Sequence, residues 1–139
     1  MTDPAGYEPR AAPPAVDGYR RLRQVTGLSP KSEAQAAAAI AGTWSWRTAL
    51  AADGSIAAMG RVVGDGGWCF LIADMATLPE HQGRGLGRAI LVALLDEIRE
   101  RAEPGAYVTL TADPPGRRLY EPLGFDDVAP GRTGMHQVL

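Results

Sequence analysis

One long helix dominates the pattern of apolar and polar positions along the chain. Between Gly87 and about Ala102, apolar residues recur every three or four positions, and charged residues occupy the opposite face. Pro104-Gly105 follows directly and ends the pattern. The spacing predicts an amphipathic helix whose apolar stripe consists of Leu86, Ile90, Leu91, Leu94, Leu95 and Ile98.

Segments rich in β-branched and aromatic residues predict strands on both sides of this helix. Asp53-Gly54 is a hairpin signal, and the run Cys69–Ala73 lacks alternation, which indicates a strand buried on both faces. The predicted strands are Thr43–Ala51, Ser55–Val63, Trp68–Thr77, Tyr107–Ala112, Phe125–Val128 and Gly134–Leu139, with Gly6–Arg10 as a short edge strand. The predicted shorter helices are Tyr19–Gly27, Glu33–Ala41 and Arg117–Leu123.

The composition is that of one globular domain. The chain has 139 residues, 45% of them hydrophobic and 22% charged, which suits a single domain at 18–139 after a partly flexible segment at 1–17. The net charge of −2 argues against nucleic acid as a partner. The single Cys69 supports neither an internal disulfide nor a cysteine metal site, and we expect no metal. Without a membrane-length apolar run or a signal pattern, we expect a cytoplasmic monomer or homodimer with no membrane partner.

The loop that leads into the long helix has glycine at positions 83, 85 and 87. A helix start leaves about four backbone N–H groups without internal partners and carries partial positive charge. Glycines remove the side chains that would keep a ligand away, so the loop predicts a cradle for phosphate or pyrophosphate. No Gly-Lys-Ser/Thr is present, which excludes a P-loop, and Arg88 stands where a dinucleotide fingerprint needs its third glycine.

Two motifs in this chain resemble the hallmarks of the GNAT superfamily of N-acetyltransferases. They are Gln82-x-x-Gly85-x-Gly87 in the loop and Leu119-Tyr120-x-x-x-Gly124-Phe125 after the long helix. The resemblance covers about residues 19–139. It implies an α/β (α+β) fold with a mixed, twisted, mostly antiparallel sheet of six to seven strands. This sheet would be splayed between strands 4 and 5 and flanked by about four helices.

The resemblance implies acetyl-CoA as the co-substrate. In the family, the pantetheine arm pairs with the backbone of the fourth strand, at positions that match Met75, Ala76 and Thr77. Thr77 replaces a usual apolar residue, but its contact would be through the backbone. The pyrophosphate would lie on the loop formed by Gln82, Gly83, Arg84, Gly85, Leu86, Gly87 and Arg88. Asp113 stands where many relatives place an asparagine on the pantetheine arm, and a carboxylate does not donate as an amide does.

The family reaction is direct attack of a primary amine on the acetyl thioester in a ternary complex. Tyr120 matches the tyrosine that protonates the departing CoA sulfur. A phenol with a pKa of about 10 suits a thiolate whose conjugate acid has a similar pKa. The alternative for Tyr120 is a purely structural role on a short helix.

A base that removes the proton of the amine is harder to assign. In relatives with a base on the fourth strand, the matching positions here are Leu71 and Ala73, and neither takes a proton. Asp74 would point to the other face by strand alternation, and only a bulge would reverse that. With such a bulge, Asp74 is the candidate base or water-linked relay, and Asp65 and Asp113 are further candidates.

The acceptor site has three candidate residues. Trp44 and Trp46 share one strand face by alternation, where they either wall an amine pocket or pack in the core. Arg61 either binds an acidic acceptor or lies on the surface. The expected function is transfer of an acetyl group from acetyl-CoA to a primary amine of a small molecule. The alternatives are a protein or peptide N-acetyltransferase and a non-catalytic acyl-CoA-binding sensor.

Overall fold

The computed structural model describes residues 3–139 and divides into two compact units. The first unit ends at Thr109, and the second spans Leu110–Leu139. The first unit contains the sheet and three helices, and the second contains one short helix. One domain over 18–139 stays a prediction, and the two units are described separately below.

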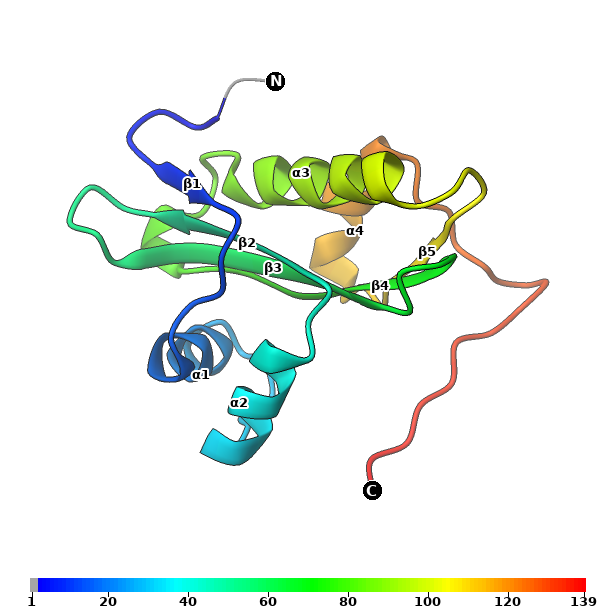
Figure 1. Cartoon of the computed structure of the whole chain (residues 1–139), viewed down its shortest axis with the longest axis horizontal. Helices are drawn as coiled ribbons and strands as arrows, with labels where there is room; N and C mark the ends of the chain where they lie inside the picture. The colour runs from blue at the N-terminus through cyan, green and yellow to red at the C-terminus, as the bar shows by residue number, and fades with distance from the viewer. Residues whose placement is uncertain (1–2) are drawn as a thin grey trace. The chain divides into compact units, whose positions relative to one another are not determined.

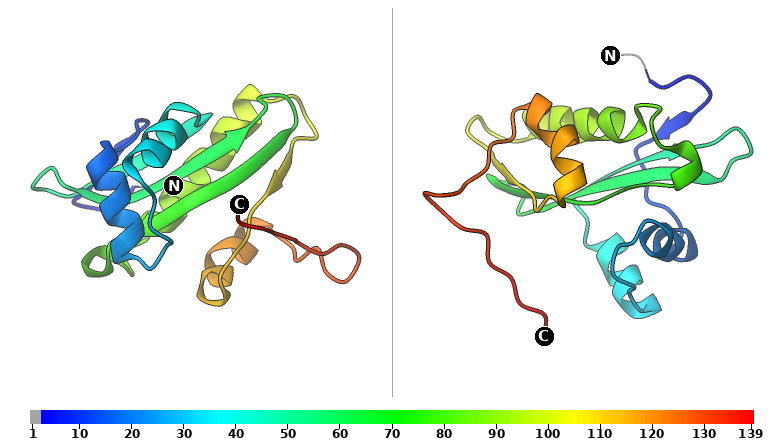
Figure 2. Two further views of the ribbon diagram at one scale, coloured as in Figure 1. Left: turned by 90° about the horizontal axis from the view of Figure 1, so that it is seen from below. Right: turned by 180° about the vertical axis from the view of Figure 1, so that it is seen from behind.

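The first unit is built on a five-stranded sheet in the order β1-β2-β3-β4-β5. Neighbouring strands are antiparallel except for β4 and β5, which are parallel. The helix α3 covers one face of the sheet, and α1 and α2 cover the other (Figures 1 and 2). The strands are β1 (Glu8–Arg10), β2 (Ser45–Leu50), β3 (Ile56–Gly64), β4 (Cys69–Thr77) and β5 (Tyr107–Thr109); the helices are α1 (Val16–Val25), α2 (Glu33–Ala41) and α3 (Leu86–Arg101).

The core between the sheet and α1 and α2 is closed by aromatic and aliphatic side chains. Tyr19 of α1 packs edge-to-face on Trp46 of β2, with 6.0 Å between ring centroids. Ser32 begins α2 with a reciprocal capping box to Gln35, which satisfies N–H groups that the helix leaves open. The buried cluster consists of Tyr19, Leu22, Ala36, Trp46, Met59, Ala76 and Leu78.

The other face of the sheet is covered by the helix that the sequence predicts most clearly. All six residues of the predicted apolar stripe of α3 are buried. Near its C-terminal end, Glu97 accepts hydrogen bonds from Ser45 of β2 and from Arg101, and it forms an ion pair with Arg47 at 3.0 Å. Local periodicity therefore places this helix correctly, and polar contacts fix it to β2.

A β-bulge interrupts the pairing of β3 with β4. Met59 pairs with Ala76 and Arg61 pairs with Ala73, so Gly60 alone faces two residues, Asp74 and Met75. A Cβ on Gly60 would overlap the sulfur of Met75 and come within 2.8 Å of Ile90 Cγ2. The bulge therefore requires a residue without a side chain at position 60.

The strand β4 has a partner on both edges for only part of its length. Its parallel ladder with β5 joins Cys69, Phe70 and Leu71 to Tyr107, Val108 and Thr109. From residue 72 to residue 77, β4 continues to pair with β3, but no strand of residues 3–139 pairs with its other edge. The predicted separation after the fourth strand is therefore present.

The second unit has no strand, so the prediction of six to seven strands is wrong. Its elements are a 3₁₀ turn at Pro114–Gly116, α4 (Arg117–Tyr120) and a 3₁₀ turn at Glu121–Leu123. The segments 125–128 and 134–139, predicted as strands, have no ladder partner, and Met135 is 94% exposed. Apolar residues alone do not make a strand, because a ladder must also pair the backbone groups.

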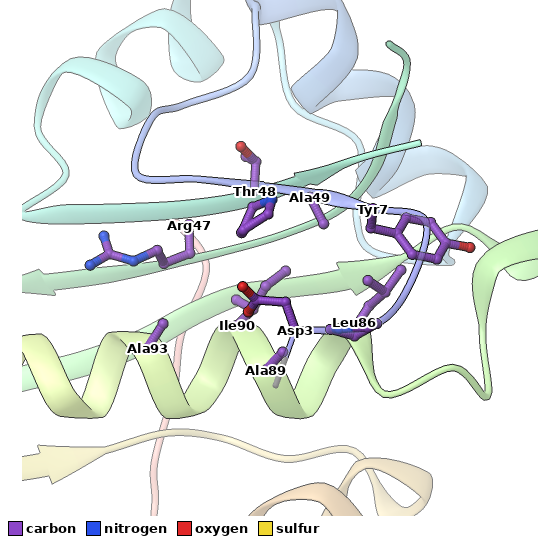
Figure 3. Close-up of a pocket in the computed structure, with 11 residues that line it drawn as sticks. Asp3, Tyr7, Arg47, Thr48, Ala49, Leu86, Ala89, Ile90 and Ala93 are labelled. Carbon is purple, nitrogen blue, oxygen red and sulfur yellow. The ribbon is translucent and has the colours of Figure 1, made fainter. Parts of the chain in front are cut away.

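The N-terminal segment crosses the first unit beside α3. The predicted edge strand at Gly6–Arg10 is present as β1, and Tyr7 forms a 2.8 Å hydrogen bond with His81. Residues 1 and 2 of the predicted flexible segment lie outside the described residues. Figure 3 shows the cavity where this segment meets β2 and α3. Its volume of about 40 Å³ admits water but not a coenzyme.

We expect Gly60→Ala to lower the free energy of unfolding by about 1–3 kcal/mol, because the methyl group overpacks Met75 and Ile90. Urea unfolding followed by circular dichroism measures this loss. Gly18→Ala in α1 is the control, since its Cβ meets only Pro14 at an ordinary 3.8 Å. That variant should be unchanged or up to about 1 kcal/mol more stable, and equal stability of both variants would contradict the packing at Gly60.

Candidate functional site

The candidate site of the first unit begins in the loop between β4 and α3. A 3₁₀ turn at Pro79–His81 leads into the glycine segment. Gly83 has φ +73° and Gly85 has φ +84°, so both have the left-handed backbone that side chains disfavour. Gly87 lies inside the first turn of α3 and is not among the positive-φ residues. Two of the three glycines thus shape the loop, and the third leaves space at the helix start.

The N-terminus of α3 has exposed backbone donors. Gly85 is its N-cap and provides no side-chain cap, and the first intrahelical bond from the loop is Ala89 N–H to the Gly85 carbonyl at 3.0 Å. The N–H groups of Leu86, Gly87 and Arg88 therefore precede the regular helical bonding. Residues 82–85 and Arg88 are exposed, so an anion can approach these groups from solvent.

The side chain of Gln82 ties this loop to the end of β4. Its amide nitrogen donates to the carbonyl oxygen of Thr77 at 3.1 Å. Met75, Ala76 and Thr77 form the last part of β4, where the edge opposite β3 has no strand partner among residues 3–139. The predicted arm-binding and pyrophosphate-binding segments are thereby brought together within one unit.

Asp74 lies at the centre of a buried polar cluster beside this edge. Its carboxylate accepts hydrogen bonds from Tyr19 at 2.6 Å, from Arg61 Nε at 2.7 Å and from Arg23 Nη1. The carboxylate is only 4% exposed, against 11% for Arg23 and 16% for Arg61. The bulge directs Asp74 toward α1, so the expectation that alternation turns it to the other face is wrong.

The surroundings of Asp74 favour its ionised form. Burial by itself raises the pKa of this carboxyl, but the hydrogen bonds from Tyr19 and Arg61 and the charges of Arg61 and Arg23 outweigh it and hold the pKa below its ordinary value. The same burial, with the hydrogen bond to Asp74, raises the pKa of Tyr19. Asp74 is therefore a carboxylate with three internal partners, not a carboxyl whose pKa suits proton uptake near neutral pH.

Tyr120 belongs to the second unit, at the end of α4. Its ring packs edge-to-face on Phe125, with centroids 5.9 Å apart, and it lines a cavity of about 240 Å³ within that unit. Burial raises the pKa of its phenol, and the charge of Asp113 adds to the effect. A raised pKa keeps the proton on the phenol at neutral pH, as a proton donor requires.

The three candidate acceptor residues have internal partners. Trp44 precedes β2, and its ring lies 4.0 Å below the guanidinium carbon of Arg101 on α3. Trp46, inside β2, is buried against Tyr19 on the opposite face, so the expectation that the two tryptophans share a face is wrong. Strand alternation did not extend to Trp44 because β2 begins at Ser45. Arg61 binds Asp74 and donates to Thr43 at 3.1 Å.

Sequence reasoning missed Tyr19 and Arg23 as partners of Asp74. Both lie more than 50 positions away along the chain, on α1. In the sequence, Tyr19 fits the apolar spacing of a helix, and no motif surrounds Arg23. The available signal was an arginine one turn after a tyrosine on the same helix. This spacing puts both side chains on one helix face, but it indicates a polar cluster only once the fold shows a buried carboxylate opposite them.

Residues 3–139 contain neither a membrane-spanning helix nor a cluster of metal-binding side chains. No helix in this part of the chain is both long and apolar enough to cross a membrane. No group of three or more histidine, cysteine, aspartate or glutamate side chains within it is arranged to hold a metal ion.

Comparison with known proteins identifies the family. Residues 45–127 match the acetyltransferase (GNAT) domain, and the chain belongs to this family. A solved structure from meticillin-resistant Staphylococcus aureus, a protein of unknown function described as a probable acetyltransferase, is 31% identical with a TM-score of 0.90. The match covers 96% of this chain and 99% of that one.

Two curated relatives match a shorter part of the chain. An uncharacterized N-acetyltransferase, ycf52, of Pyropia yezoensis is 32% identical over 84 residues, which are 60% of this chain and 47% of the relative. The chloroplastic serotonin N-acetyltransferase 2 of Oryza sativa subsp. japonica is 32% identical over 82 residues, which are 59% of this chain and 40% of the relative. The chain thus matches less than half of the length of these relatives.

The polar cluster predicts a pH dependence of stability. Because the pKa of Asp74 is lowered on folding, its contribution is complete above the unfolded pKa of about 4 and is lost as the pH falls through the folded pKa. The unfolding free energies of the wild type and of Asp74→Asn should therefore differ by a constant amount between pH 5 and 8 and converge below about pH 4. Urea titrations at each pH measure the difference, and a gap that widens in acid would contradict the assigned ionised state.

Proposed function

We propose that this chain transfers an acetyl group from acetyl-CoA to the primary amine of a small molecule. The observation that carries the proposal is the uncapped N-terminus of α3 beside the open edge of β4, in a chain of the GNAT family. Members of this family generally use acyl-CoA. The name of the Oryza relative specifies serotonin, a small amine, and supports this substrate class.

The two halves of acetyl-CoA suit the two adjacent segments. The diphosphate would be held by backbone N–H groups of residues 83–88, where the helix dipole favours negative charge. The pantetheine arm would pair with the backbone of Met75, Ala76 and Thr77 as an added strand does. Gln82 keeps the two segments together through its bond to Thr77. Arg84 and Arg88 add positive charge beside the diphosphate, and Asp113 remains a candidate contact of the arm.

The reaction needs one bond formed and one broken. The neutral amine attacks the thioester carbonyl carbon, a C–N bond forms, and the C–S bond breaks to release CoA thiolate. Tyr120 gives its proton to this sulfur, and the ammonium formed at the nitrogen loses one proton to solvent. A backbone N–H of Met75 or Ala76 would stabilise the developing negative charge on the carbonyl oxygen.

The acceptor amine must lose its proton before it attacks. Asp74 is a poor base because its partners lower its pKa. An amine with a pKa of about 10.4 carries a penalty of about 4–5 kcal/mol at pH 7. Desolvation of the ammonium in the site reduces this penalty, since burial disfavours the charged form. We therefore propose that the site selects acceptors by desolvation, with no dedicated carboxylate base.

The diphosphate assignment is tested at Gly87. Gly87→Glu should weaken acetyl-CoA binding at least a hundredfold, because a carboxylate at the start of α3 repels and displaces the diphosphate. Calorimetric titration with acetyl-CoA measures the affinity. Position 87 is preferable to Gly83 or Gly85, since a side chain at either of those would also strain a left-handed backbone.

A matched control for this variant exists in α2. Ala34 is the second residue of α2, as Gly87 is the second residue of α3, and it is exposed. Ala34→Glu adds the same charge at the same helical position and should leave acetyl-CoA affinity unchanged. Normal binding by Gly87→Glu, or equal loss in both variants, would overturn the diphosphate assignment.

The acid role is tested by Tyr120→Phe, which removes one oxygen atom. We expect kcat to fall at least tenfold while acetyl-CoA affinity stays within about threefold, because general acid catalysis typically contributes 10²–10⁴-fold. Release of CoA thiol with a panel of primary amines and N-terminal peptides measures the rate. Unchanged kcat in Tyr120→Phe would remove this residue from the acid role, and turnover of peptides alone would replace the small-molecule acceptor.

A further inference from the structure

The backbone of Asp74 has an unusual conformation. Its φ of +54° makes it the only residue other than glycine with positive φ among the described residues 3–139. Aspartate tolerates this left-handed region better than most residues, but a strand does not ordinarily use it. Such a conformation persists only where surrounding structure holds it, and it often occurs at functional sites.

The surrounding structure holds Asp74 from two elements. Tyr19 and Arg23 reach it from α1, and Arg61 reaches it from β3. Arg23 is itself fixed, because its Nε donates to the Ser29 carbonyl at 2.9 Å and its Nη2 donates to the Ser29 hydroxyl at 3.0 Å. The carboxylate is therefore tied to a helix, to a neighbouring strand and, through Arg23, to the segment before α2.

The other side of the same bulge is equally constrained. Met75, the second residue of the bulge, occupies the space above Gly60 and lies near Ile90 of α3. Asp74 and Met75 thus point to opposite faces of the sheet, each against a different helix. A bulge leaves its extra residue outside the regular ladder, and this bulge lies where β4 has already separated from β5.

We propose that Asp74 is a positioning residue, whose carboxylate, held by Arg23, Arg61 and Tyr19, fixes the bulge so that the Met75–Ala76 backbone is presented to the acyl group. This inference rests on the proposed function, because it assigns a role in acetyl transfer to a group that does not touch the reacting atoms. It also explains why a buried carboxylate lies beside the site although its pKa is unsuited to a base.

A comparison of two variants separates positioning from base catalysis. Arg23→Met removes one tie but keeps the carboxylate. If Asp74 positions the backbone, this variant loses activity. If Asp74 is the base, the loss of a neighbouring positive charge raises its basicity, so activity is kept or increased and the acidic limb of the pH–rate profile moves to higher pH. Asp74→Asn removes the charge but retains a residue type that tolerates positive φ.

The wild type, Arg23→Met, Asp74→Asn and the control Arg21→Met are compared. Arg21 is exposed on α1, so its replacement removes the same charge from the same helix. Three quantities are measured: kcat against pH, the affinity for acetyl-CoA by calorimetry, and amide hydrogen exchange at residues 73–77. We expect Arg23→Met and Asp74→Asn to lose kcat at least tenfold, with affinity within about threefold and the acidic limb unmoved.

Amide hydrogen exchange measures how firmly the bulge is held, and it does not depend on catalytic turnover. We expect the amides of Met75 and Ala76 to exchange at least tenfold faster in Arg23→Met than in the wild type or Arg21→Met. Should either variant fail to fold, Tyr19→Phe removes only the 2.6 Å hydrogen bond and should shift exchange and kcat in the same direction.

Each result has one consequence. Unchanged exchange in Arg23→Met, or retained kcat with a shifted acidic limb, overturns the positioning role and leaves acetyl transfer intact. A wild type that binds acetyl-CoA but turns over no amine or peptide overturns the proposed function and, with it, the catalytic part of this inference. The exchange data then still show whether the carboxylate fixes the bulge.

Discussion

Backbone groups without a strand or helix partner are the constraint on which this structure depends. Such groups must be paired or remain in contact with water. From residue 72 onward β4 has a partner on one edge only, and α3 begins soon afterwards without a side-chain cap. Two neighbouring segments therefore present polar backbone groups to solvent. A ligand that joins an amide-containing arm to a diphosphate would suit both, and this is the basis on which acyl-CoA is proposed without any unusual side chain.

The bulge in β4 places Met75 and Asp74 where a regular strand would not place them. Gly60 has no side chain, so Met75 can fill the space beneath α3. The adjacent Asp74 can then turn toward α1, where it meets Tyr19 and two arginines. A side chain at position 60 would expel Met75, and loss of the carboxylate would leave two largely buried guanidinium groups without their anion. The geometry of the β4 edge thus depends on contacts on both faces of the sheet.

Local patterns predicted most of the first unit. The stripe of α3, the helix Glu33–Ala41 and the strands around Asp53-Gly54 all follow from residues near one another in the chain. The last two predicted strands are absent because apolar residues at 125–128 and 134–139 do not supply a ladder partner. Two partners of Asp74, Tyr19 and Arg23, could not be predicted either, since contacts between side chains more than 50 positions apart have no local signal. The glycine loop was predictable because it acts through backbone conformation.

The state of Asp74 limits the chemistry that the site can perform. A carboxylate that neutralises two arginines is stabilised as an anion, and the same stabilisation makes it a weak proton acceptor. A base that serves near neutral pH needs a pKa near that pH, so the two roles oppose each other at one residue. In the proposed reaction, proton loss from the acceptor would then depend on the amine itself, through desolvation or low intrinsic basicity. Under the proposed function, this would favour amines that carry apolar groups, because such amines lose their hydration at lower cost than compact, strongly hydrated ammonium ions.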